Sequence, residues 1–70
     1  MIYKTVKLED GCEFTGLFAG DKRLYGTKTY PNGATYTGFY VDDVREGVGI
    51  KQWADGTQVT VRYVKGIKRS

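Results

Sequence analysis

The sequence predicts an all-β protein whose strands follow one another as an antiparallel meander. Ten glycines, six tyrosines and eight threonines in 70 residues, with short segments of alternating apolar and polar side chains, favour strands. A two-residue turn signal recurs at Asp10-Gly11, Asn32-Gly33 and Asp55-Gly56, with spacings of 22 and 23 residues. A constant spacing of this size indicates a repeated supersecondary unit. No segment shows the sustained period of about 3.6 residues that is typical of an amphipathic helix.

About six strands are expected, and a short turn can join every neighbouring pair. The strands cover residues 2–8, 12–18, 24–30, 34–41, 47–53 and 57–64. The first is strand-like from Ile2-Tyr3-Lys4 onward, and Asp10-Gly11 turns the chain from it into the second. The third and fourth meet at Pro31-Asn32-Gly33, and the fifth and sixth meet at Ala54-Asp55-Gly56.

The three glycine signals also predict the geometry of their turns. Proline suits the second position of a type I turn, asparagine or aspartate the third, and glycine the left-handed fourth. This is the three-residue hairpin loop with a glycine bulge. The expected closing pairs are Leu8–Cys12, Tyr30–Ala34 and Trp53–Thr57.

Two longer connections, at residues 19–23 and 41–46, are expected between the other strands. Their expected closing pairs are Phe18–Leu24 and Tyr40–Gly47. Counting outward from both kinds of turn gives one consistent register. In this register a single row crosses the sheet through Lys4, Gly16, Gly26, Gly38, Gly49 and Val61. A slip of one residue would move every side chain to the other face, so the row is a strict prediction.

The same register divides the side chains between two faces. The aromatic face carries Ile2, Val6, Leu8, Phe14, Phe18, Leu24, Tyr30, Tyr36, Tyr40, Trp53, Val59 and Tyr63. The opposite face, called the threonine face below, is mainly polar. Its apolar members are Leu17, Phe39, Val48 and Ile50.

Size and composition limit how the chain can be stabilised. Seventy residues suffice for one domain, residues 1–70, near the lower limit for a self-supporting core. Cys12 is the only cysteine and histidine is absent, so neither an internal disulfide nor a zinc site is expected. Stability must come from packing. No apolar run approaches about 18 residues and no signal-peptide pattern opens the chain, so a soluble cytoplasmic protein is expected.

In this register the chain resembles the MORN repeat (membrane occupation and recognition nexus). The matching segments of the central unit are Tyr36-Thr37-Gly38-Phe39-Tyr40, Gly47-Val48-Gly49 and Trp53-Ala54-Asp55-Gly56. The first unit is similar at Phe14-Thr15-Gly16-Leu17-Phe18, although Leu24 stands where the family has glycine. In the third unit Tyr63 and Lys65-Gly66 survive.

The resemblance covers about residues 10–66. The expected units are residues 10–32, 33–55 and 56–70. It implies an elongated, single-layer, twisted antiparallel sheet that scaffolds other proteins, and lipid binding is associated with the family name. In the third unit Val59 and Val61 stand in place of tyrosine and glycine, so this unit resembles a terminal cap.

The expected function is docking of a partner protein on the aromatic face. A single layer has no second layer to cover its rings, and large exposed apolar patches mark interaction surfaces. The expected partner-binding residues are Phe14, Phe18, Tyr30, Tyr36, Tyr40, Trp53 and Tyr63. A second copy of the chain would fit the same surface, and the open edge near Tyr63 could pair with a partner strand.

The glycine row has two interpretations. Its members within strands are Gly16, Gly26, Gly38 and Gly49. Each costs roughly 0.5–1 kcal/mol relative to alanine, which calls for a structural or functional reason. In the first interpretation, rings of the same chain lie over the glycines, as in aromatic rescue. In the second, the row is a trough that accepts the backbone or a helix of the partner.

Basic residues suggest an alternative function, binding to a phospholipid or membrane surface. The net charge is +3, and the last 14 residues hold four bases and no acid. The expected anionic contacts are Lys28, Lys51, Arg62, Lys65, Lys68 and Arg69. The alternative is a solvated edge that resists aggregation, with lysine stems packed on rings. Nucleic acid is a disfavoured partner, because eight acids dilute eleven bases.

Nothing in the sequence indicates catalysis, a cofactor or a metal site. Histidine is absent, and the acids lie mostly in expected turns. Asp42-Asp43 is interpreted as a solvated turn, and Cys12 as a small buried side chain rather than a nucleophile. The chain is therefore expected not to be an enzyme.

Overall fold

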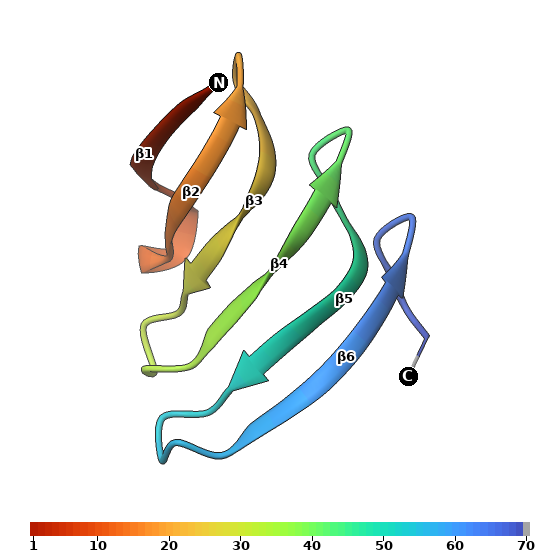
Figure 1. The fold of residues 1–70 in the computed structure, drawn as a ribbon. Coiled ribbons are helices and arrows are strands. Elements are labelled where there is room, and N and C mark those ends of the chain that lie inside the picture. Colours follow the sequence, from red (N-terminus) through yellow and green to blue (C-terminus); the bar gives the residue numbers. More distant parts are fainter. Residues whose placement is uncertain (70) are drawn as a thin grey trace.

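The computed structural model describes residues 1–69 as one open, twisted antiparallel sheet (Figure 1). Its strands are β1 Ile2–Lys7, β2 Glu13–Ala19, β3 Lys22–Thr29, β4 Thr35–Val41, β5 Val44–Gln52, β6 Gln58–Val64 and β7 Ile67–Lys68. Their order across the sheet is their order in the chain, so every hairpin joins neighbours. The predicted all-β antiparallel meander is confirmed, and the short β7 adds a strand that the sequence did not predict.

The predicted register is confirmed along the entire glycine row. The observed pairs are Lys4–Gly16, Gly16–Gly26, Gly26–Gly38, Gly38–Gly49 and Gly49–Val61. The closing pairs of the glycine turns are present as well. The backbone N–H groups of Leu8, Tyr30 and Trp53 donate to the carbonyls of Cys12, Ala34 and Thr57. The local chemistry of these turns is therefore consistent with the register of the whole sheet.

Two of the three glycine turns have the predicted geometry, and the first differs. Gly33 and Gly56 have φ values of 91° and 93°, and each N–H donates to the carbonyl three residues earlier. In the first turn, Glu9–Gly11 form a short 3₁₀ segment in which both Asp10 and Gly11 are left-handed, with φ of 64° and 79°. Aspartate tolerates this conformation, so the same hairpin closes in a different way.

The two connections predicted to be long are two-residue turns instead. Residues 20–21 join β2 to β3, and Asp42 and Asp43 join β4 to β5. Asp42 and Asp43 have φ of 51° and 67°, as the central residues of a type I′ hairpin turn do. Its backbone matches the right-handed twist of the strands, which explains why the shorter turn forms here.

The residues that the predicted connections contained, but that the shorter turns do not use, form β-bulges in β3 and β5. The predicted pairs Phe18–Leu24 and Tyr40–Gly47 are wrong and are replaced by Phe18–Arg23 and Tyr40–Arg45. A bulge realigns the register beyond it, which is why the glycine row keeps its predicted pairing. The bulges also place Arg23 and Arg45 on the aromatic face, opposite Phe18 and Tyr40.

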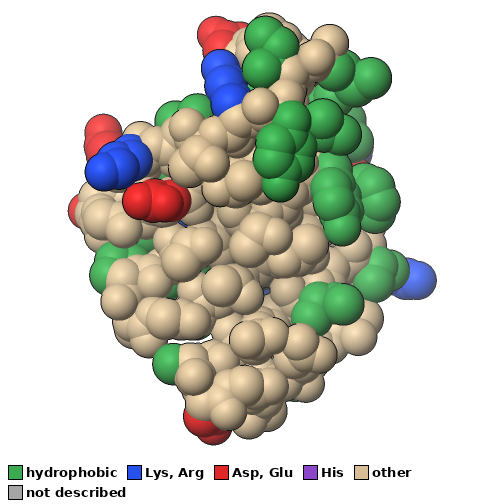
Figure 2. All heavy atoms as spheres, turned by 60° about the vertical axis from the view of Figure 1, so that its left-hand side comes forward, with side chains coloured by type: hydrophobic (Ala, Val, Ile, Leu, Met, Phe, Trp, Pro, Cys, Tyr) green, Lys and Arg blue, Asp and Glu red, His purple; other side chains and the backbone are tan. Residues whose placement is uncertain are grey.

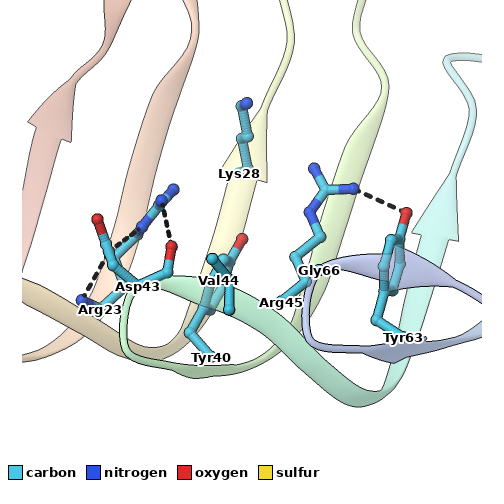
Figure 3. Close-up of a pocket in the computed structure, with 8 residues that line it drawn as sticks. All are labelled: Arg23, Lys28, Tyr40, Asp43, Val44, Arg45, Tyr63 and Gly66. Carbon is cyan, nitrogen blue, oxygen red and sulfur yellow. Dashed lines mark hydrogen bonds and ion pairs between the residues drawn. The ribbon is translucent and has the colours of Figure 1, made fainter.

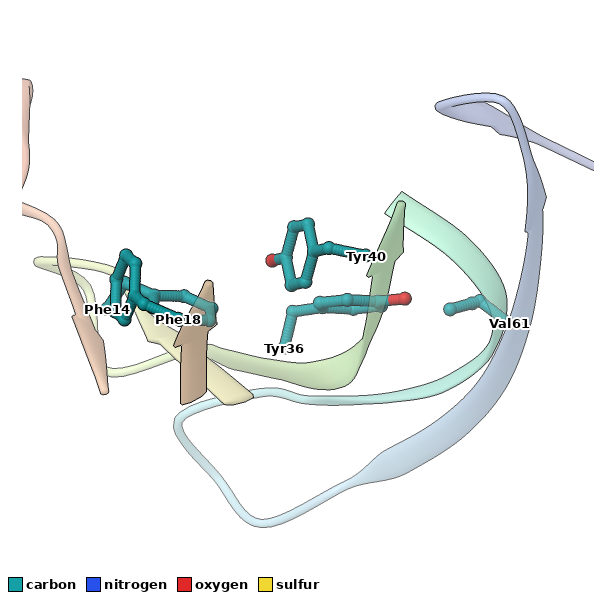
Figure 4. Close-up of a cluster of buried hydrophobic side chains, with 5 residues drawn as sticks. All are labelled: Phe14, Phe18, Tyr36, Tyr40 and Val61. Carbon is teal, nitrogen blue, oxygen red and sulfur yellow. The ribbon is translucent and has the colours of Figure 1, made fainter. Parts of the chain in front are cut away.

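The sheet curves around a core on its aromatic face (Figure 4). The buried apolar side chains are Cys12, Phe14, Phe18, Ala34, Tyr36, Tyr40 and Val61. Phe14 packs edge to face against Phe18 and Tyr40, with ring centroids 5.5 and 5.3 Å apart. Tyr36 packs in the same way against Tyr63 at 5.6 Å. These edge-to-face contacts place the aromatic quadrupoles favourably.

The glycine row gives the rings of Tyr36 and Phe14 their space. A Cβ atom at Gly38 would lie 2.6 Å from the Tyr36 hydroxyl oxygen, and one at Gly49 would lie closer still. A Cβ atom at Gly26 would lie 2.7 Å from the Phe14 ring. Side chains at these positions would overlap the rings. At Gly26, Gly38 and Gly49 the structure agrees with the first interpretation, in which rings of the same chain lie over the glycines. At Gly16 the backbone of β3 lies where a Cβ atom would be.

The threonine face is polar at its centre and apolar toward one end. The Thr27 and Thr37 hydroxyls lie 2.7 Å apart and share a hydrogen bond across β3 and β4. Phe39 is 56 % exposed, and its ring packs against that of Tyr25 at 4.7 Å. In the space-filling view, hydrophobic side chains gather in a band along the right-hand side (Figure 2).

Candidate partner-binding site

The aromatic residues predicted to bind a partner fall into two groups. Phe14, Phe18, Tyr36 and Tyr40 are buried. Tyr30, Trp53 and Tyr63 keep part of their surface exposed. The expectation that a single layer leaves its rings uncovered is wrong for the first group. Tyr36 and Phe14 lie over glycines, and Phe18 and Tyr40 pack edge to face against Phe14. Of the second group, Trp53 is 41 % exposed.

Arg23 covers part of the buried cluster. Its guanidinium carbon lies 4.7 Å from the Tyr40 ring centroid and 5.5 Å from that of Phe14. Its backbone N–H and its Nε–H donate to Asp43 Oδ1 at 3.1 and 2.7 Å, and Nη2 donates to the Asp43 carbonyl at 3.0 Å. These hydrogen bonds from Arg23 lower the pKa of the Asp43 carboxyl below its ordinary value. Arg23 is therefore fixed, and its charge is compensated within the chain.

Arg45 covers the other part of the cluster. Its guanidinium carbon lies 4.3 Å from the Tyr36 ring centroid, a cation–π contact. Nη1 donates to the Tyr63 hydroxyl at 2.8 Å, and Nη2 donates to the Tyr30 hydroxyl. Burial disfavours the guanidinium charge, but the interactions with Tyr30 and Tyr63 outweigh it and raise the pKa of Arg45. Arg45 is thus a half-buried cation held by neutral groups.

A hollow of about 250 Å³ lies between these side chains on the aromatic face (Figure 3). Its lining residues are Arg23, Lys28, Tyr40, Asp43, Val44, Arg45, Tyr63 and Gly66. They come from β3, β4, β5 and β6 and from the turns that follow β4 and β6. The hollow therefore exists only because the two-residue turns bring the arginines to this face.

The Tyr40 hydroxyl is the most unusual group in the hollow. The Tyr40 side chain is 4 % exposed, and its hydroxyl makes no hydrogen bond within residues 1–69. Figure 3 shows the hydroxyl directed toward the space between Lys28 and Arg45. Burial raises the pKa of Tyr40 above its ordinary value, although the charges of Arg45 and Arg23 oppose this shift. The hydroxyl therefore keeps its proton and can donate it in a hydrogen bond.

Lys28 and Lys51 lie on either side of Tyr36 in the sheet. Their ammonium groups lie over other rings, that of Lys28 over Tyr30 at 5.0 Å and that of Lys51 over Trp53 at 5.5 Å. Each lysine stem thus runs along the aromatic face toward its rim. Lys28 also lines the hollow together with Arg23 and Arg45, whereas Lys51 does not.

The other predicted anionic contacts do not gather at this site. Arg62 pairs with Val48 on the threonine face. Lys65 lies in the turn between β6 and β7, with φ of 51°. Lys68 lies in β7, and Arg69 donates its backbone N–H to the Arg62 carbonyl. The basic residues at this end of the chain are therefore spread over two sides of the sheet.

Arg23 and Arg45 are the site residues that sequence reasoning missed. Both were assigned to long connections, where their side chains would be solvated. The signal that could have found Arg45 is Asp42-Asp43, since adjacent aspartates suit a two-residue turn with positive φ. Such a turn would have placed Arg45 in a strand, opposite Tyr40.

The structure offers no grouping of metal ligands and no membrane-spanning helix in its described part. Within residues 1–69, no three acidic or cysteine side chains lie together as a metal site would need. No helix in the same range is long and apolar enough to cross a membrane.

The family model of the MORN repeat matches residues 25–35 and 36–58, from β3 to the start of β6. The chain carries MORN repeats. The second matched segment contains Tyr36 together with both glycines under its ring, so the family pattern coincides with the contact that forms the core. MORN repeats are in general non-catalytic modules that mediate protein or membrane interactions. No curated protein matches the chain.

Proposed function

We propose that this chain is a non-catalytic protein–protein interaction module, a small accessory or scaffold subunit. Its partner docks along the rim of the aromatic face, beside the hollow, rather than in the glycine trough that the chain's own rings fill. The proposed location is the cytoplasm, since the lone Cys12 suits a reducing compartment.

The observation that carries the proposal is the exposed edge of an otherwise buried aromatic cluster. Tyr30 and Tyr63 are half-buried and pack against the cluster, while Trp53, which follows β5 on the same face, is 41 % exposed. Tyrosine and tryptophan anchor interfaces because they offer large contact areas with few rotatable bonds. Arg45 holds both tyrosines through their hydroxyls, so these anchors are ordered before a partner arrives.

A photo-crosslinking amino acid tests which face binds. One variant carries it at Trp53, on the rim of the aromatic face, and a matched variant carries it at Phe39, on the threonine face. Both positions are similarly exposed, so random collisions label them alike. We expect the Trp53 variant to form a defined protein adduct in the host cell extract, resistant to about 0.5 M salt, and the Phe39 variant to form none.

Three outcomes would contradict the proposal. Equal yields of adduct from both positions would show that the partner does not prefer the aromatic face. Adducts from Phe39 alone would assign docking to the threonine face. Crosslinking to lipid alone, abolished at moderate salt, would favour the phospholipid alternative. Mass measurement of a Trp53 adduct distinguishes a second copy of this chain from a different protein, and both are compatible with the proposal.

A further inference from the structure

The hollow on the aromatic face holds more positive charge than the chain compensates. Three cations line it, Arg23, Lys28 and Arg45, and Asp43 is the one acid among its lining residues. Asp43 is already paired with Arg23, with a Nε to Oδ1 distance of 2.7 Å. Within residues 1–69, neither Lys28 nor Arg45 forms an ion pair with a carboxylate. An anion entering the hollow would therefore meet two uncompensated charges.

Hydrogen-bond donors in the hollow are also unused. The guanidinium of Arg45 has five N–H groups, and the described contacts use one from each terminal nitrogen, to Tyr63 and Tyr30. The Tyr40 hydroxyl has no partner within residues 1–69 and its oxygen has less than 1 Å² exposed, so a ligand in the hollow reaches it only after a small shift of the side chains around it. A buried donor without a partner destabilises the fold, so a ligand that accepts from it recovers this free energy.

The chemistry of these donors favours a carboxylate. A planar carboxylate matches the fork of a guanidinium and accepts several charge-assisted hydrogen bonds. A phosphate monoester, with a charge of about −1.5 to −2, would be attracted by the same cations and is therefore the competing ligand in the test below. Val44 and the ring of Tyr40 add apolar walls that suit the methylene groups of an acidic side chain.

We infer that this hollow binds the side-chain carboxylate of an aspartate or glutamate in the partner protein. Its oxygens accept hydrogen bonds from Arg45 and from the Tyr40 hydroxyl, while the Lys28 ammonium adds attraction. The inference deepens the proposed function, because it assumes that the carboxylate belongs to a docked protein. The site itself can be tested without that protein.

The test is an NMR titration of the complete chain at low ionic strength. The probe is N-acetylglutamate N-methylamide, and its neutral isostere N-acetylglutamine N-methylamide is the control. We expect the acid to shift the Arg45 Nε–H signal and the backbone amides around Tyr40 saturably, in the millimolar range. We expect the amide to cause at least tenfold smaller effects at equal concentration, since a hydrogen bond to a charged group is the stronger one.

Two pairs of matched variants assign the binding to the hollow. Tyr36 and Tyr40 are both buried with unpartnered hydroxyls, but only Tyr40 lines the hollow. Tyr40→Phe should weaken binding of the acid about tenfold, and Tyr36→Phe should leave it unchanged. Lys28→Gln should weaken it severalfold, whereas Lys7→Gln, an equal charge change at an exposed edge position, should have less than a twofold effect. Neither Tyr→Phe change enlarges a cavity, so both variants should remain folded, as the amide spectrum will verify.

Several results would overturn the inference. They are equal binding of acid and amide, equal effects of the two Tyr→Phe variants, and shifts located away from the hollow. Tighter binding of inorganic phosphate, or Tyr40-dependent binding to vesicles containing anionic lipid, would assign the hollow to phosphate instead. Failure of the crosslinking experiment with a positive titration would refute the docking proposal alone, and the reverse combination would refute the carboxylate site alone.

Discussion

The two faces of the sheet give opposite environments to aromatic side chains of the same strand. Tyr36 and Phe39 both belong to β4, yet Tyr36 is 1 % exposed and Phe39 is 56 % exposed. The Tyr36 ring lies over Gly38 and Gly49, which have no side chains to keep it off the backbone. Phe39 has Tyr25 as its cross-strand neighbour and packs against it instead, with the ring planes tilted by 51°. For this pair of rings, burial depends on whether glycines leave room for the ring against the sheet.

This comparison explains how one layer of strands can contain a core. The glycines let rings lie close to the sheet backbone, and the curved strands surround the rings at the sides. Arginine guanidinium groups cover part of their solvent side. Arg23 lies over Tyr40, and Arg45 lies over Tyr36. The threonine face has none of these features, so its aromatic residues stay in contact with solvent. Four predictions test this difference, from the largest expected effect to the smallest.

Replacing Tyr36 by alanine should have the largest effect. Removing a buried aromatic side chain typically costs about 3–5 kcal/mol, a large share of the total stability of so small a domain. Urea-induced unfolding followed by circular dichroism measures the loss. A cost below about 1 kcal/mol would mean that the ring is not part of a core.

Replacing Gly49 by alanine should have the next largest effect. The added Cβ atom overlaps the Tyr36 ring, and overpacking of this kind typically costs about 1–3 kcal/mol. The same unfolding experiment applies. In the double variant with Tyr36→Ala the cost of the alanine at position 49 should largely disappear, because the ring it displaces is gone. If the stability costs of Gly49→Ala and Tyr36→Ala simply added in the double variant, the effect at Gly49 would not arise from the Tyr36 ring, and the explanation would be wrong.

Alkaline pH should destabilise the fold through the two buried tyrosines of the aromatic face. Burial raises the pKa values of Tyr36 and Tyr40 above their ordinary 10.0, so the folded chain keeps protons that the unfolded chain releases. This contribution to stability is complete below about pH 10 and is lost as the pH rises toward the folded-state pKa values. Tyrosinate absorbance at 295 nm should show Tyr36 and Tyr40 ionising together with unfolding. Variants Tyr36→Phe and Tyr40→Phe whose absorbance curves match that of the unchanged chain up to the unfolding transition would agree with this. A loss of early absorbance in either variant would contradict the burial.

Replacing Phe39 by alanine should have the smallest effect. The ring is mostly exposed, and the loss concerns its stacking on Tyr25, which is typically worth about 0.5–1.5 kcal/mol. The free energy of unfolding should therefore fall by much less than in Tyr36→Ala. Comparable losses at the two positions would show that both faces contribute equally to stability.

The sequence predicted the fold well because its register depends on local turn chemistry. Each Asp-Gly or Asn-Gly signal specifies one hairpin, and the glycine row follows by counting. The bulge in β5 was missed because the counting relied on glycine signals, and the turn at Asp42-Asp43 has positive φ without glycine. For that reason Arg45 was assigned to a connection, and the hollow around Tyr40 was not predicted. The burial of the aromatic rings was misjudged. Alternation of apolar and polar residues shows which face a ring is on, but the curvature of the sheet and the orientation of the ring decide how much solvent reaches it.

The position of the Tyr36 ring has a consequence for how the number of hairpins can change in evolution. Its ring rests on a glycine of its own strand and on one of the next strand, so the contact is complete within a single hairpin step. A protein of this kind can gain or lose such steps without redesigning a shared interior, since each contacts only its neighbours. Copy number can then vary among relatives while the geometry of every individual step stays the same.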